Sequence, residues 1–171
     1  MADPMRLRVL KALTAVIAGV TPANGYTSDL SPYADEGGTM RSRVARGKVQ
    51  FGTEPLPLVS ILDHPDTGDT MMGSGGRPVA KSEWLLLVQG WAVDDFDHPT
   101  DPAHVLAADV ITAIARERAK RTDVLGQGAR VMEIHIGQPI VRPAMQGLSD
   151  AACFFLTLRV EMAEDLNNPF A

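Results

Sequence analysis

Apolar residues recur at two different spacings along this chain, and each spacing predicts a different kind of element. Between Pro4 and Ala18 they recur every three or four residues, which is typical of a helix with one buried face. The apolar positions of this stripe are Leu7, Leu10, Leu13, Val16 and Ile17. Asp3 stands where an N-cap belongs, Pro4 at the first helical position, and Gly19 where a helix commonly ends. We therefore expect an amphipathic helix over residues 4–18.

The last third of the chain alternates apolar and polar residues at every second position, which predicts half-buried strands. The first predicted strand runs from Val131 to Gly137, with Met132, Ile134 and Ile136 facing the core and Glu133 and His135 facing outward. The second runs from Phe154 to Met162, with five apolar side chains on one face and Thr157, Arg159 and Glu161 on the other. If these two strands pair, Glu133 and Arg159 are expected to face each other.

The region from Lys81 to Arg118 predicts a complete strand–turn–helix unit. Residues 84–93 form its strand, which is apolar on both faces, so both faces need covering by helices or by another subunit. Asp101 as N-cap and Pro102 at the first position open its helix. The predicted buried stripe of this helix is Leu106, Val110, Ala113 and Ile114. Its end carries Arg116, Arg118, Lys120 and Arg121, where the helix dipole favours cations.

The remaining segments complete an α+β fold class. Leu56 to Leu62 is a short apolar strand that Pro55 and Pro57 confine to a strand start or a sheet edge. Residues 63–82 form a long, glycine-rich, flexible loop inserted between two strands, and residues 163–171 form a polar C-terminal tail. We expect one domain over residues 1–171, with a single mixed or antiparallel β-sheet and two main helices packed on one side of it.

Composition narrows the possible partners. The chain has 171 residues and a net charge of -5, so no global attraction to DNA or to anionic lipid is expected. The single cysteine, Cys153, excludes an internal disulfide and is expected to be a buried, unreactive thiol. No segment has the roughly 18 consecutive apolar residues of a membrane span. Because Lys11 interrupts the first apolar run, we expect a soluble helix there instead of a signal peptide. The chain is then expected to be located in a reducing cytoplasm.

Catalytic and metal-binding patterns are weak throughout. The four histidines, His64, His98, His104 and His135, show no zinc-hydrolase spacing. Asp94, Asp95 and Asp97 beside His98 could hold a hard cation, but a solvated strand-to-helix turn is the better interpretation. The glycines of MMGSGGRP are not followed by the Lys-Ser or Lys-Thr of a phosphate loop, and Asp63-His64 has no recognisable nucleophile. We expect no enzyme activity, catalytic residue, bound metal or cofactor.

One segment departs from the acidic background. Thr39 to Phe51 carries four cations, at Arg41, Arg43, Arg46 and Lys48, and Gly47 could break or bulge a strand there. The segment is either a solvated strand face or a contact with another subunit or with phosphates, and the latter would be weak and sensitive to salt. As a candidate assembly interface we take these four cations together with three residues of the long loop, Met71, Met72 and Arg77.

Two stretches, RGKVQFGTEPLPLVSILDHP and EWLLLVQGWAVDDFDHPTDPAHVLAADV, give the chain a family resemblance. Across residues 46–118 the sequence resembles the tail terminator, or tail completion, proteins of long-tailed bacteriophages. The resemblance implies a fold around a mixed sheet and a hexameric ring of identical chains. Such a ring caps the finished tail tube, ends its polymerisation and presents a surface to the head connector, and DNA passes through it without specific binding.

The resemblance also implies partners and a location. The partners are further copies of the chain, the tail tube protein and the head connector or stopper protein. The location is the tail or neck of the virion, after assembly in the host cytoplasm. The loop over residues 63–82 departs from a minimal version of this fold, and we expect it to contact the tube or a neighbouring subunit. Two alternatives remain open: a head–tail connector stopper or minor tail protein, and an enzyme or small-ligand-binding domain.

Overall fold

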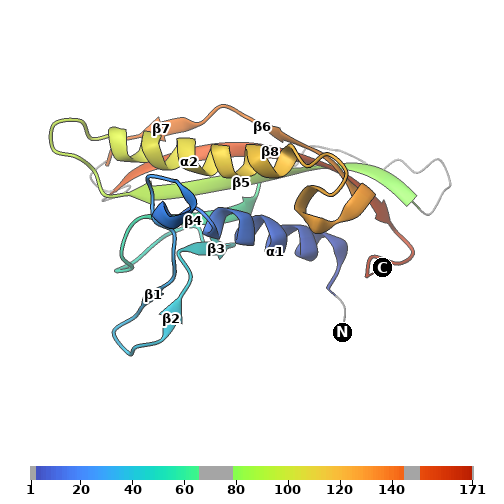
Figure 1. Cartoon of the computed structure of the whole chain (residues 1–171), viewed down its shortest axis with the longest axis horizontal. Coiled ribbons are helices and arrows are strands. Elements are labelled where there is room, and N and C mark those ends of the chain that lie inside the picture. Colours follow the sequence, from blue (N-terminus) through green and yellow to red (C-terminus); the bar gives the residue numbers. More distant parts are fainter. Residues whose placement is uncertain (1–2, 66–78, 145–150, 171) are drawn as a thin grey trace.

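The residues that the structure describes form two helices, one mixed sheet and a small two-stranded hairpin (Figure 1). This computed structural model describes residues 3–65, 79–144 and 151–170. The helices are α1 (Met5–Ala18) and α2 (Asp101–Arg118), and three single 3-10 turns lie at Pro22–Asn24, Val124–Gly126 and Gly128–Arg130. The strands are β1 (Tyr33–Ala34), β2 (Met40–Arg41), β3 (Val44–Arg46), β4 (Leu58–Asp63), β5 (Val79–Ala92), β6 (Val131–Ile136), β7 (Ile140–Arg142) and β8 (Ala152–Asp165).

Two long antiparallel strands form the centre of the main sheet. β5 and β8 pair along their whole length, from Val79 opposite Asp165 to Ala92 opposite Ala152. β4 lies antiparallel on the other side of β5, and β3 pairs with β4 in parallel. β6 and β7 both pair with β8, one along each half of that strand. The α+β class with a mixed sheet is therefore confirmed.

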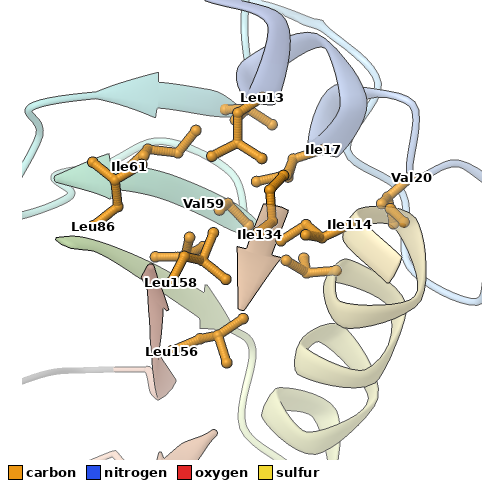
Figure 2. Close-up of a cluster of buried hydrophobic side chains, with 14 of the residues drawn as sticks. Leu13, Ile17, Val20, Val59, Ile61, Leu86, Ile114, Ile134, Leu156 and Leu158 are labelled. Atoms are coloured by element: carbon orange, nitrogen blue, oxygen red, sulfur yellow. The ribbon is translucent and has the colours of Figure 1, made fainter. Parts of the chain in front are cut away.

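Both helices cover the same face of this sheet, and Figure 2 shows the buried side chains that meet between them. α1 contributes Leu13 and Ile17, and α2 contributes Ile114. The inward residues of β8 that the alternation predicts, from Phe154 to Met162, are all fully buried here. The stripe of α2 and the alternation of β8 therefore place the core correctly. The stripe of α1 is right only at Leu13 and Ile17, because this helix buries Met5 and Val9 and leaves Leu7, Leu10 and Val16 half-buried.

The helix starts differ from the prediction by about one residue. α1 begins at Met5 with Pro4 as N-cap, and Asp3 instead forms an ion pair with Lys11, with 2.6 Å between carboxylate oxygen and Nζ. α2 has Thr100 as N-cap, so Asp101 is the first helical residue and its side chain caps nothing. Asp101 stabilises the helix through the positive end of its dipole instead.

A bulge in β6 overturns part of the predicted alternation. Val131 lies opposite Met162, but Glu133 lies opposite Glu161, so Met132 is the extra residue of the bulge. Val131 is consequently buried, and Met132, predicted to face the core, is 40% exposed. The two strands do pair, but Arg159 lies opposite His135 and not opposite Glu133, so the predicted partner of Arg159 is wrong.

The strands on both sides of the predicted loop extend into it. β4 continues through Asp63 and β5 already begins at Val79, so both ends of the 63–82 loop belong to the sheet. β8 continues through Asp165, and the predicted polar tail therefore begins later than residue 163. Residues 66–78 lie outside the described part of the chain.

Candidate assembly surface

The face of the sheet opposite the helices is only partly covered. Among the side chains that strand register places on this face are five apolar ones that are half-buried or exposed. They are Leu62, Leu85, Leu87, Phe155 and Ile140, and we call them the open sheet face. The sequence predicts that β5 is apolar on both faces, and the described residues cover one of those faces with helices and leave the middle of the other only half-buried.

One end of the same face is covered by the segment that connects β3 to β4. The Phe51 ring contacts the Trp91 ring with centroids 5.4 Å apart, and Leu56 packs on the same small cluster. Cys153 lies in this cluster, where burial raises the pKa of its thiol. The buried cysteine agrees with the prediction of an unreactive thiol.

A groove of about 560 Å³ lies beside this cluster, under the β1–β2 hairpin. Figure 1 shows the hairpin extending away from the rest of the molecule. The groove is lined by residues of the hairpin, of the β3–β4 segment and of the sheet, among them Tyr33, Lys48 and Trp91. Three of the predicted interface residues, Arg41, Arg43 and Lys48, are part of its lining.

Two of these cations are neutralised by carboxylates. The Arg41 Nε atom lies 2.8 Å from Asp35 Oδ2, and this bond, with the N–H of Thr39, holds the pKa of Asp35 below its ordinary value. Lys48 forms an ion pair with Glu54. That bond, with the N–H of Gly52, lowers the pKa of the Glu54 carboxyl to about 2. Each ion pair joins two residues of the same segment, so one stabilises the hairpin and the other stabilises the β3–β4 segment.

Arg43 and Arg46 differ in their surroundings. The Arg43 guanidinium lies over the Tyr33 ring, 5.1 Å from its centroid, and donates to the carbonyl oxygens of Pro55 and Pro57. Arg46 is exposed and forms no ion pair with any residue that the structure describes. Gly47 follows with φ +73 and ends β3, so the predicted strand break is confirmed. In this segment Arg43 therefore has a structural role, and Arg46 is an exposed cation without an ion pair to any described residue.

The prediction from sequence found the cations of the groove but not their partners. The other three predicted interface residues, Met71, Met72 and Arg77, lie outside the described residues. Tyr33, Asp35 and Glu54 were missed, because ion pairs between loop residues six positions apart leave no periodic signal in a sequence. The local excess of positive charge is consequently smaller than the sequence indicates, which weakens the phosphate-contact interpretation of this segment.

The other polar clusters have structural roles in the part of the chain that is described. Asp95 accepts the backbone N–H groups of Asp97 and His98, which lowers its pKa and shapes the β5–α2 turn. His135 lies 2.8 Å from Glu161, which also pairs with Lys81 across the sheet. Within residues 3–65, 79–144 and 151–170, no group of three or more potential metal ligands is close enough to hold an ion.

Neither a known protein family nor a curated protein sequence matches this chain. The helices that the structure describes are too short or too polar to cross a lipid bilayer.

Proposed function

We propose that the chain is a structural virion protein that forms a ring, caps a bacteriophage tail tube, ends its polymerisation and joins the tail to the head. The observation that carries this proposal is the open sheet face. Its five apolar side chains lie on a face that no described helix covers, and their partial exposure in the single chain favours coverage by another protein surface. A capping ring provides that coverage by neighbouring copies or by the tube end.

Three further features support the proposal. The mixed sheet is what the sequence resemblance implies. The β1–β2 hairpin extends from the body, as an arm that reaches a neighbouring protein would (Figure 1). Two of the three predicted cations in the groove beneath it are paired with carboxylates, and the third, Arg43, donates to backbone carbonyls. The chain is also acidic overall, and both features suit a ring through which DNA moves without being held.

The proposal is tested by following the elongation of tail tubes, assembled from the tube protein of the same virus, by light scattering. Addition of the chain is expected to stop elongation at about one ring per tube end. Continued elongation at a large excess of the chain contradicts the proposal. Binding to the connector side of the head without any effect on tubes also contradicts it and supports a stopper protein.

A pair of matched variants connects the activity to the open sheet face. Leu87→Gln places a polar group at the middle of this face and is expected to weaken capping about tenfold or more while costing no more than about 1 kcal/mol of stability. Leu166→Gln changes an exposed leucine that follows β8, outside the face, and is expected to cap normally. Equal capping by both variants shows that the open sheet face is not the contact.

A further inference from the structure

The turn between β5 and α2 presents an exposed aromatic ring among carboxylates. Phe96 is 98% exposed, more than any other large apolar side chain in the described residues, and Val93 in the same turn is also exposed. Asp94, Asp97 and Asp101 flank it and form no ion pair with any described residue. Figure 1 shows this turn projecting at the end of the molecule where α2 begins. An exposed ring of this kind is typical of a side chain that inserts into a partner.

The opposite end of α2 carries a groove with complementary chemistry. It has a volume of about 600 Å³ and lies between the last turns of α2 and β6. Its apolar lining is Ala115, Ala119 and Met132, and its polar lining is Arg118, Arg121 and Glu133. The β6 bulge turns Met132 out of the core and into this groove.

The charges at the groove favour an acidic occupant. Arg118 forms an ion pair of 3.2 Å with Glu133, whereas Arg121 forms no ion pair with a residue that the structure describes. Lys120 beside them is paired with Glu117. The helix dipole accounts for carboxylates at the start of α2 and cations at its end. The dipole does not explain why an exposed phenylalanine lies at the start of α2 and an apolar groove lining lies at its end.

We propose that Phe96 of one copy inserts into the groove between α2 and β6 of the next copy, with Asp94 and Asp97 facing Arg118 and Arg121. An 18-residue helix is about 27 Å long, so the turn of a chain cannot reach its own groove. The contact therefore joins two different surfaces head to tail, which is the type that closes a ring. This proposal rests on the proposed ring and identifies the surfaces that close it.

Two charge-reversed variants test the contact by sedimentation of the full chain. The groove variant is Arg118→Glu with Arg121→Glu, and the turn variant is Asp94→Lys with Asp97→Lys. The turn variant leaves Asp95 intact because that carboxylate shapes the turn. Each variant alone is expected to associate at least about tenfold more weakly than the unmodified chain. An equimolar mixture is expected to recover association, because alternating copies bring opposite charges together at every contact.

Two single variants control for folding and for general charge effects. Phe96→Ser removes a side chain with almost no contacts in its own chain, so it leaves the melting temperature unchanged and is expected to weaken association. Lys11→Glu reverses an exposed charge on α1, outside both surfaces, and is expected to have no effect on association.

The outcomes separate this contact from the proposed function. A mixture that associates no better than its two components overturns the contact, and so does an unmodified chain that remains monomeric up to about 1 mM. If rings still form and cap tubes with the groove variant alone, the function stands and the contact fails. If the predicted association occurs but tubes are not capped, the contact stands and the function fails.

Discussion

Gly90 allows the two central strands of the sheet to carry a large buried ring between them and the helices. Phe154 lies directly opposite Gly90 and is fully buried. A Cβ atom at position 90 would lie 2.1 Å from the Phe154 ring, closer than any real contact. Gly90→Ala is therefore expected to lower the free energy of unfolding by about 1–3 kcal/mol, measured by chemical denaturation.

The control is Gly90→Ala in a variant whose side chain at position 154 is smaller. In a Phe154→Leu background, Gly90→Ala is expected to cost clearly less, because the ring that it strikes is absent. Equal costs in the two backgrounds would show that the clash with Phe154 is not the cause.

Glu117 is a buried carboxylate that holds the turn at Leu125. Its Oε1 accepts the backbone N–H of Leu125 at 2.9 Å, and its other oxygen pairs with Lys120. Leu125 has a φ of +57, so this bond holds a turn that the backbone does not favour. Glu117→Leu is expected to cost about 1–3 kcal/mol in thermal or chemical unfolding. Glu117→Gln keeps an acceptor oxygen and is expected to cost less; a Gln variant as unstable as the Leu variant contradicts the role of this bond.

At the scale of elements, the attachment of the β3–β4 segment is expected to depend on pH. The pKa of Glu54 in the folded chain is about 2, below its ordinary value of 4.5. The stabilisation from its bond to Lys48 is therefore complete above about pH 4.5 and is lost as the pH falls toward 2. Hydrogen exchange of the Gly52 amide, which donates to Glu54, is expected to report faster opening of this segment as the pH is lowered through that range, after correction for the intrinsic pH dependence of exchange.

Glu54→Gln provides the comparison for this prediction. The variant lacks the titrating carboxylate, so opening of its β3–β4 segment is expected to be independent of pH between about 2 and 4.5. A pH dependence that persists in the variant would assign the effect to another group, with Asp35 the nearest candidate because its pKa is also lowered.

The structure contains every element that periodicity predicts, but it also contains the short strands β1, β2 and β7, which are too short to show a period. Other errors lie where a local feature interrupts the period. The stripe of α2 places Leu106, Val110 and Ile114 in the core as predicted. The same stripe, extended by three residues, reaches Glu117, so its burial could have been predicted. The β6 bulge could not have been predicted, because the alternation of apolar and polar residues in the sequence looks the same with or without it.

At the scale of the whole molecule, the candidate surfaces were predictable only in part. Because β5 is apolar on both faces, the sequence indicates that one face needs a partner, but it does not indicate which face the helices take. The predicted basic interface is partly neutralised by Asp35 and Glu54, and the sequence does not show that each of them pairs with the cation six residues away. The pairing of Phe96 with the groove near Met132 depends on the length and direction of α2.

Electron microscopy of tail-tube ends incubated with the purified chain tests the ring most directly. Averaged images are expected to show a closed ring of identical subunits on the tube end, with the open sheet face buried and the β5–α2 turn of each subunit against the end of α2 in the next. Bare tube ends beside free single particles, at saturating concentrations of the chain, would contradict the account.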